Sequence, residues 1–191
     1  MLPESIETPR GRYLQDTLQA AAEGAWADWP TLTRDDYVIV ANIIVMFSYM
    51  DLNLQRIADV TDSASVLKAP WAGKTAKLTM AQTEEAVQSL DWSEQNREAL
   101  KKIEAFRGLR NILAHFVLRR FPNDDALACL AISARDYERQ LGRKPERGEI
   151  LTAVFDIEQL KGAVRHIESV QLWLAKVTAE VELLYPRRSG A

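Results

Sequence analysis

The feature that most constrains the fold is a long apolar pattern of helical period near the C-terminus. Apolar side chains recur every three or four positions over roughly seven turns, at Ile157, Leu160, Val164, Ile167, Val170, Leu174, Val177 and Val181. A strip of this kind is typical of a helix that buries one face. Asp156 and Gln159 form the sequence pattern of a capping box, so we expect the helix to begin there and to end before Pro186.

A second segment with the same period predicts a long helix from Thr33 to about Val60. Thr33 followed by Asp36 is typical of a helix start, because the hydroxyl caps free backbone N–H groups. The apolar strip is wide enough to indicate burial on several sides, and it consists of Ile39, Ile43, Met46, Phe47, Met50 and Leu54. The most hydrophobic part, residues 37–50, falls short of the roughly 20 residues needed to cross a bilayer, so we expect a core helix and no membrane segment.

The middle of the chain alternates between loop and helix signals. Pro70 and Gly73 predict a loop within residues 62–77, followed by a shorter helix around residues 79–90. Asp91 and Glu94 form another capping box, which predicts a second long helix through about His115.

The period changes after this second long helix. Residues 116–121 and 126–133 are short runs rich in strand formers, separated by a turn-like segment at 122–125, and they predict an antiparallel hairpin. Residues 149–155 predict a third strand. The expected fold class is therefore mainly α, with a small antiparallel hairpin or three-stranded insertion before the last helix.

Length and composition indicate one helical domain with two extensions. The 191 residues, 47% of them hydrophobic, suffice for one domain at residues 33–186, with a loosely attached N-terminal arm at 1–32 that carries one helical piece and a C-terminal tail at 187–191. The net charge of −3 argues against broad attraction to nucleic acid. The single cysteine, Cys129, excludes an internal disulfide and is expected to be buried and inert. We see no secretory signal and expect a cytoplasmic protein.

One face of the predicted helix ending at His115 has an unusual polar composition. On a helical wheel, the side chains that fall within about 80° of His115 are those of Glu104, Arg107, Gly108 and Asn111. Glycine leaves open space beside the carboxylate, the guanidinium, the amide and the imidazole. Arg110 lies about 140° away, so we expect either a distorted helix or a meeting of Arg110 and His115 across a subunit interface.

The string Arg110-Asn111-Ile112-Leu113-Ala114-His115 resembles the Arg-x4-His motif of HEPN domains. The resemblance extends in helix order over about residues 35–185 and implies a HEPN-like helical bundle. Many members of that family are metal-independent endoribonucleases of toxin–antitoxin, antiviral or RNA-processing systems, and paired protomers bring two copies of the motif together. The resemblance therefore implies a homodimer, an RNA substrate, a possible antitoxin or other partner protein, no metal and no cofactor.

The resemblance assigns roles that suit the residue types. His115 would exchange protons with the ribose 2'-hydroxyl and the leaving 5'-oxygen, while Arg110 would stabilise the charged phosphorane and Asn111 would assist. We expect a local basic patch from three flanking arginines and support from two carboxylates, which are Arg107, Arg119 and Arg120, and Glu104 and Asp51 respectively.

Structural roles for the same residues stay open at this stage. His115 alone would be favourable as a cap on the free carbonyls of its helix, and Arg110 and Glu104 would serve as surface ion-pair partners. A non-catalytic HEPN-like module that binds a partner protein or a nucleotide is the alternative function, and an ordinary helical scaffold is the third possibility.

Overall fold

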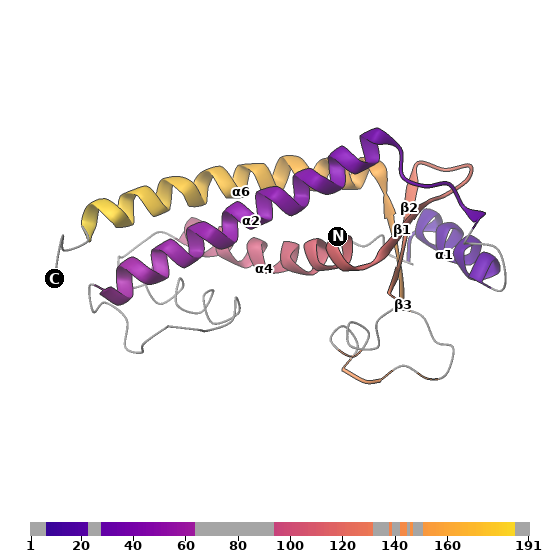
Figure 1. Cartoon of the computed structure of the whole chain (residues 1–191), viewed down its shortest axis with the longest axis horizontal. Helices are drawn as coiled ribbons and strands as arrows, with labels where there is room; N and C mark the ends of the chain where they lie inside the picture. Colours follow the sequence, from indigo (N-terminus) through magenta and orange to yellow (C-terminus); the bar gives the residue numbers. More distant parts are fainter. Residues whose placement is uncertain are drawn as a thin grey trace. The chain divides into compact units, whose positions relative to one another are not determined.

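The chain is mainly helical and carries one small three-stranded antiparallel sheet (Figure 1). The computed structural model describes residues 7–22, 28–63, 94–131, 138, 142–144, 146 and 151–185. Their elements are, in order, α1 (Pro9–Ala22), α2 (Arg34–Ser63), α4 (Glu94–His115), β1 (Val117–Arg120), β2 (Ala126–Ala131), β3 (Leu151–Asp156) and α6 (Ile157–Leu184). The expected helix at residues 79–90, the loop before it and Asp91 lie outside the described residues.

The described residues form two compact units. Unit 1 comprises Met1–Ile44 and Gly108–Val164, and unit 2 comprises Val45–Arg107 and Arg165–Ala191. Unit 1 contains the sheet and α1, whereas unit 2 is built from helical segments of α2, α4 and α6.

The sheet of unit 1 has the strand order β1-β2-β3, with both neighbouring pairs antiparallel. Val117 lies opposite Leu130 in the first pair, and Leu127 lies opposite Phe155 in the second. The hairpin closes with a hydrogen bond from the Phe121 N–H to the Ala126 carbonyl, 3.0 Å. The predicted hairpin and the predicted third strand are both confirmed.

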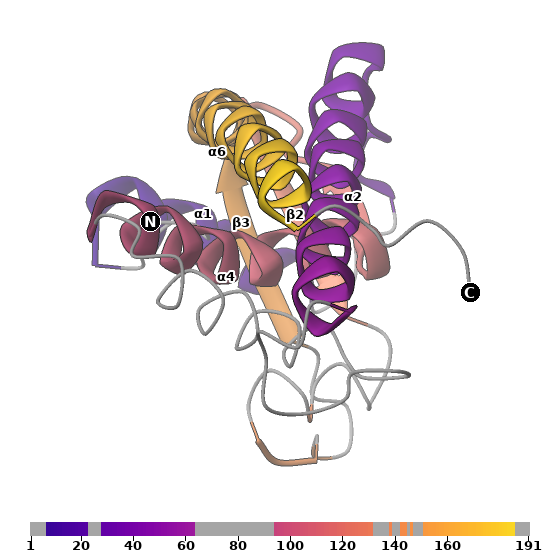
Figure 2. The same cartoon turned by 90° about the vertical axis from the view of Figure 1, so that its left-hand side faces the viewer.

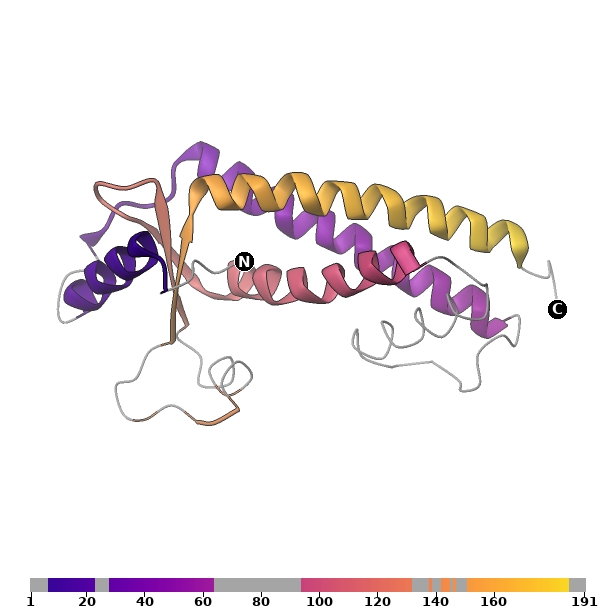
Figure 3. The ribbon, with the colours of Figure 1, turned by 180° about the vertical axis from the view of Figure 1, so that it is seen from behind.

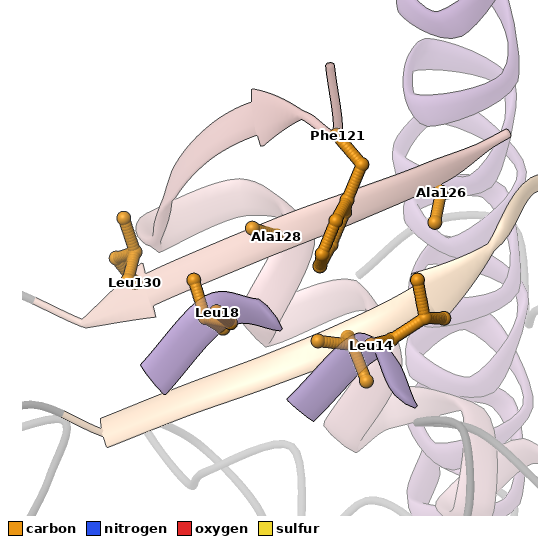
Figure 4. Close-up of a cluster of buried hydrophobic side chains, with 7 residues drawn as sticks. Leu14, Leu18, Phe121, Ala126, Ala128 and Leu130 are labelled. Carbon is orange, nitrogen blue, oxygen red and sulfur yellow. The ribbon is translucent and has the colours of Figure 1, made fainter. Parts of the chain in front are cut away.

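Helix α1 covers one face of this sheet (Figure 4). Its Leu14 and Leu18 are fully buried in a cluster with Phe121, Ala126, Ala128, Leu130 and Val154. The ring centroid of Trp29 lies 4.7 Å from that of Phe121 at the margin of the cluster. The N-terminal helix is therefore part of the core of unit 1, whereas the sequence predicted only a loosely attached arm.

A buried carboxylate fixes the start of α2. The Thr33 hydroxyl accepts a hydrogen bond from the Asp36 N–H, and the Thr33 N–H donates to the Asp36 carboxylate at 2.8 Å, which closes the capping box. Arg120 of β1 donates to the same carboxylate at 2.6 Å and also pairs with Asp125. The predicted start of this helix is confirmed, and Arg120 ties it to the hairpin.

The start of α6 is capped as its sequence predicts. Asp156 accepts hydrogen bonds from the N–H groups of Glu158 (2.9 Å) and Gln159 (3.4 Å). Arg10, from the first turn of α1, pairs with Asp156 at 2.7 Å and with Asp124 at 3.0 Å. One guanidinium thereby connects α1, the hairpin turn and the last strand.

Unit 2 has a helical core with ion pairs at its surface. The side chains that are at most 6% exposed there include Phe47, Met50, Leu54, Ile57, Ile103, Ile167, Val170, Leu174, Val177 and Val181. Arg56 of α2 makes a two-pronged pair with Glu182 of α6 at 2.7 and 2.8 Å. The helical spacing predicted for residues 156–185 and 33–60 is thus seen as burial along α6 and α2.

Helix α2 has one apolar face that is exposed among the described residues. Within the described residues, Arg34–Val60 is the helix long and apolar enough to cross a membrane by length and composition, with a mean hydropathy of 1.6. Core helices of soluble proteins share those properties, and Ile43, Phe47 and Met50 are fully buried. The expected burial on several sides holds for one face only, because Val38, Val45, Tyr49 and Leu52 remain about half exposed.

Candidate functional site

The Arg-x4-His segment lies at the end of α4, where the chain passes directly into the sheet (Figure 3). The Phe116 N–H still donates to the Ile112 carbonyl at 2.9 Å, and β1 begins one residue later at Val117. His115 is the basic residue of the last helical turn. The last carbonyls of a helix have no partner within the helix, so a side chain with N–H donors in this turn can donate to them.

Apolar residues on the opposite side anchor this end of α4. Leu109, Ile112, Leu113 and Phe116 are all at most 9% exposed. Their burial fixes the rotation of the helix in unit 1, so that His115 is exposed and Arg110 and Asn111 are half-buried. The amphipathic pattern predicted for this helix is confirmed at its C-terminal end.

Arg110 folds round the helix toward its neighbour. Its Nη1 donates a hydrogen bond to the Asn111 side-chain oxygen at 3.0 Å. Asn111 lies about 40° from His115 on the helical wheel, one turn before it. This bond joins Arg110 to one residue of the polar face. The Arg110 Cα–Cβ direction remains about 140° from that of His115.

The Arg110 guanidinium keeps unused hydrogen-bonding capacity. Its Nε is buried, and within the described residues it has no hydrogen-bond partner. The donors of a guanidinium form a planar fork, and this shape suits arginine to hold an oxyanion.

Open space lies beside the motif in unit 1. A Cβ atom built on Gly108 meets no other atom within 4 Å. The helix here has an ordinary backbone, so the glycine serves as a gap in the side-chain surface rather than as a turn. The space expected at Gly108 is present.

The two arginines of β1 point to opposite faces of the sheet. Arg119 is opposite Ala128, which belongs to the cluster under α1, so Arg119 lies on the α1 face; its Nε is buried and has no partner among the described residues. Arg120 points the other way and is neutralised by Asp36 and Asp125. The structure therefore does not bring Arg119 and Arg120 together on one surface, and Arg120 is engaged in holding α2 to the hairpin.

The remaining predicted site residues belong to unit 2. Arg107 is 15% exposed, pairs with Asp51 at 3.0 Å and lies 5.1 Å over the Phe47 ring. These contacts place a cation against α2 within unit 2, so Asp51 partners Arg107. Glu104 is a residue of α4 whose side chain lies outside the described part of the chain.

Described residues of unit 2 line two shallow hollows. One is lined by Arg56, Val60, Glu182 and Tyr185, and the other follows the surface of α6 from Arg165 to Lys176. The described residues contain no group of three or more His, Cys, Asp or Glu side chains that could hold a metal ion. Sequence reasoning did not single out either hollow. The first joins residues such as Arg56 and Glu182, which are 126 positions apart.

Comparison with family models, with curated proteins and with solved structures finds no match to this chain. The resemblance to HEPN domains thus depends on the motif and on the order of the elements, and the function that it implies is a proposal.

Proposed function

We propose that the protein is a HEPN-type endoribonuclease that cleaves single-stranded RNA without a metal ion, acting in the cytoplasm as a toxin or defence component. The observation that carries the proposal is the hydrogen bond from Arg110 to Asn111, because it links the cation to the residue one turn before His115. The exposed imidazole in the last turn of α4 and the open space at Gly108 support access of a polymer.

The proposed chemistry uses one proton carrier and one anion holder. His115 takes the proton from a ribose 2'-hydroxyl as its oxygen attacks phosphorus, and a protonated imidazole then gives a proton to the leaving 5'-oxygen as the P–O5' bond breaks. Arg110 neutralises the charge that accumulates on the phosphorane oxygens. Asn111 orients Arg110 through its carbonyl oxygen and offers its amide N–H groups to a phosphate oxygen. The products are a 2',3'-cyclic phosphate and a 5'-hydroxyl.

The proposed assembly is a homodimer in which two copies of the motif line a composite cleft. The RNA backbone requires local positive charge because the chain carries a net charge of −3. Arg110 and Arg119 are the best candidates for that charge, since Arg120 and Arg107 already have carboxylate partners. An antitoxin or other partner protein would act by covering the exposed His115.

The decisive experiment is cleavage of single-stranded RNA by the purified full chain in EDTA. We expect His115→Ala to reduce the rate by about 10²- to 10⁴-fold and Arg110→Ala by about 10²- to 10³-fold. The chain offers a matched control in its one other histidine, His166, which is exposed on α6. His166→Ala should leave the rate unchanged, and the 5' fragments should end in a cyclic phosphate.

Activity that survives both His115→Ala and Arg110→Ala would remove this assignment, as would cleavage that depends on added metal ions. Retention of the rate in Arg110→Lys would remove the role of the planar fork, because lysine supplies the charge without its geometry.

A non-catalytic module that binds a partner protein or a nucleotide is the second candidate. The observation that favours it is the position of His115 at the carbonyl end of α4, where an imidazolium stabilises the helix by about 0.3–1 kcal/mol without any chemistry. This candidate predicts no RNA cleavage by the wild-type chain. It also predicts a lower melting temperature for His115→Ala and Arg110→Ala, measured by circular dichroism at pH 6.

A further inference from the structure

Helix α2 carries a stripe of exposed side chains along its whole middle. All seven positions of the stripe are exposed, and we call them the outer stripe: Val38, Ala41, Asn42, Val45, Ser48, Tyr49 and Leu52. They fall within about 60° on either side of Val45 on the helical wheel. Since α2 is one unbroken helix (Figure 2), the relative directions of these side chains follow from the helical period alone.

The outer stripe is more apolar than the exposed face of a solvated helix. Val38, Val45, Tyr49 and Leu52 each keep between 50% and 54% of their surface exposed. The stripe contains no charged residue, whereas exposed helix faces ordinarily carry mixed charges. An uncharged, half-apolar stripe about 20 Å long indicates a surface that another molecule covers.

The spacing of the stripe is that of a helix–helix seam. Val38, Val45 and Leu52 are seven positions apart, and so are Asn42 and Tyr49. A seven-residue repeat keeps an apolar seam facing a second helix over several turns. A flat surface such as a bilayer makes no use of that repeat, and it would leave the central Asn42 and Ser48 in an apolar medium.

The stripe is complementary to itself when a copy runs in the opposite direction. A two-fold axis at Val45 pairs positions whose numbers add to 90. Val38 then meets Leu52 of the second copy, the small Ala41 meets the large Tyr49, and Val45 meets its own counterpart. The two polar positions also meet each other, Asn42 with Ser48, which fixes the register as a polar pair does in a coiled coil.

The symmetry of the pattern ends where the apolar stripe ends. The next positions that would pair are Arg34 and Arg56, two cations. Glu182 pairs with Arg56 at 2.7 Å, so the repulsion between the two arginines is reduced by a carboxylate of the same chain. A two-fold interface places the same surface of both copies in contact, so it requires this kind of self-complementarity.

We propose that the outer stripe of α2 binds the same stripe of a second copy of this chain, with the two α2 helices antiparallel and a two-fold axis at Val45. A second copy fits because side-chain size and polarity are complementary at every paired position. This proposal does not depend on whether the motif at Arg110 and His115 cleaves RNA. If the chain dimerises through the outer stripe but does not cleave RNA, only the endoribonuclease proposal is refuted.

A charge exchange across the axis tests the direction of pairing. The wild-type chain should sediment at about 100 µM with twice the chain mass of 21.6 kDa. Val38→Lys alone and Leu52→Glu alone should each weaken dimerisation by at least about tenfold, because each leaves two charges against apolar side chains. The double variant should restore it, since Lys at position 38 then faces Glu at position 52 of the second copy in both halves of the interface.

Leu183→Glu provides the matched control for Leu52→Glu. Leu183 is a more exposed leucine, 81%, near the end of α6 and outside the outer stripe. Its replacement should leave the dimer intact. Circular dichroism of each variant checks that the helices are retained. A monomeric wild-type mass refutes the proposal even where a variant does not fold, while a dimeric mass supports the α2 stripe only together with the loss in Leu52→Glu, because a dimer through the motif has the same mass.

Cysteine cross-linking gives an independent measurement of the axis. Val45→Cys should form a disulfide-linked dimer in air-oxidised buffer, while Leu183→Cys should not, because only position 45 lies next to itself across the proposed axis. The native Cys129 is fully buried and does not compete.

Three results would overturn the proposal. The first is a wild-type chain that stays monomeric at about 100 µM, a concentration well above a micromolar Kd. The second is a double variant that stays monomeric while both single variants are folded and monomeric, because a parallel pair would give that result. The third is binding to phosphatidylcholine vesicles that Leu52→Glu abolishes in a monomeric wild-type chain, which would assign the stripe to lipid.

Discussion

Asp36 joins three parts of unit 1, and its replacement by asparagine measures what that junction contributes. The carboxylate is 2% exposed and accepts hydrogen bonds from the Thr33 N–H (2.8 Å), the Thr33 hydroxyl (2.7 Å) and Arg120 Nη1 (2.6 Å). Asparagine keeps the size of the side chain but removes its charge and replaces one acceptor by an amide N–H group. Arg120 would then depend on Asp125, which is largely exposed to solvent.

The structure sets the size of the effect. A hydrogen bond to a charged group contributes about 1.5–3 kcal/mol, and the amide group of asparagine can satisfy the two Thr33 donors only with its single oxygen. We therefore expect Asp36→Asn to lower the free energy of unfolding by about 3 kcal/mol. For a chain of this length that corresponds to a melting temperature lower by about 6–12 °C.

Asp35 is a matched control on the same helical turn. It is exposed, and the change Asp35→Asn removes the same charge from the first turn of α2. Its charge acts through the helix dipole and a solvent-screened attraction to Lys161, and we expect a decrease below about 1 kcal/mol. Urea unfolding followed by circular dichroism at pH 7 compares the two variants with the wild type.

The pH dependence follows from the pKa of Asp36. Burial alone raises this pKa, but the hydrogen bonds from Thr33 and the charge of Arg120 lower it by more, so it lies below the usual 3.8. The stabilisation is therefore fully present above pH 3.8 and disappears as the pH falls through the lower pKa of the folded state. Equal stability of Asp36→Asn and Asp35→Asn at pH 7, or a difference that does not shrink in acid, would refute the reasoning.

Two further predictions concern the core of unit 1. Leu18→Ala should lower the free energy of unfolding by about 2–5 kcal/mol, because Leu18 of α1 is fully buried against the sheet, while Gln19→Ala on the exposed side of the same helix should change it little. Equal losses in urea unfolding would contradict the packing of α1 on the sheet. Cys129 should not react with a thiol-specific disulfide reagent in the folded chain at pH 8 and should react fully in urea, because burial raises the pKa of its thiol. Rapid reaction in native buffer would show that β2 is accessible.

The elements that the sequence predicts well are those with local signals. Thr33 with Asp36 and Asp156 with its following N–H groups lie within four residues of each other, so their capping needs no knowledge of the fold. The hairpin between residues 117 and 131 is also local, because alternating strand formers flank a short turn. These signals place α2, α6 and the sheet to within a few residues.

Contacts between distant segments were not predictable in the same way. The apolar pattern of α1 spans only two turns at Leu14 and Leu18, and the residues that bury them, such as Val154, lie more than 100 positions away. Arg120 was expected to bind RNA because it follows the motif, yet its partner Asp36 is 84 positions earlier. No single-sequence pattern connects such residues, since their pairing depends on the completed fold.

The candidate site is intermediate between these cases. The position of His115 at the end of α4 follows from the amphipathic pattern before it and the strand after it. The hydrogen bond from Arg110 to Asn111 does not, because a helical wheel gives the direction of Cα–Cβ bonds and ignores the length of an arginine side chain. Side-chain reach is therefore the physical quantity that the wheel lacks, and it accounts for the contact between Arg110 and Asn111.

The position of β1 has a consequence for the behaviour of concentrated protein. The strand order makes β1 an edge strand, and an unpaired edge is a template for strands of neighbouring molecules. Here the Arg120 N–H already donates to the Pro30 carbonyl at 2.9 Å, and Arg119 and Arg120 place two guanidinium groups on a strand of four residues. Fibril-like growth along this edge would have to break that bond and place another strand against the guanidinium groups, so the short, charged strand protects this edge of the sheet against amyloid-type aggregation.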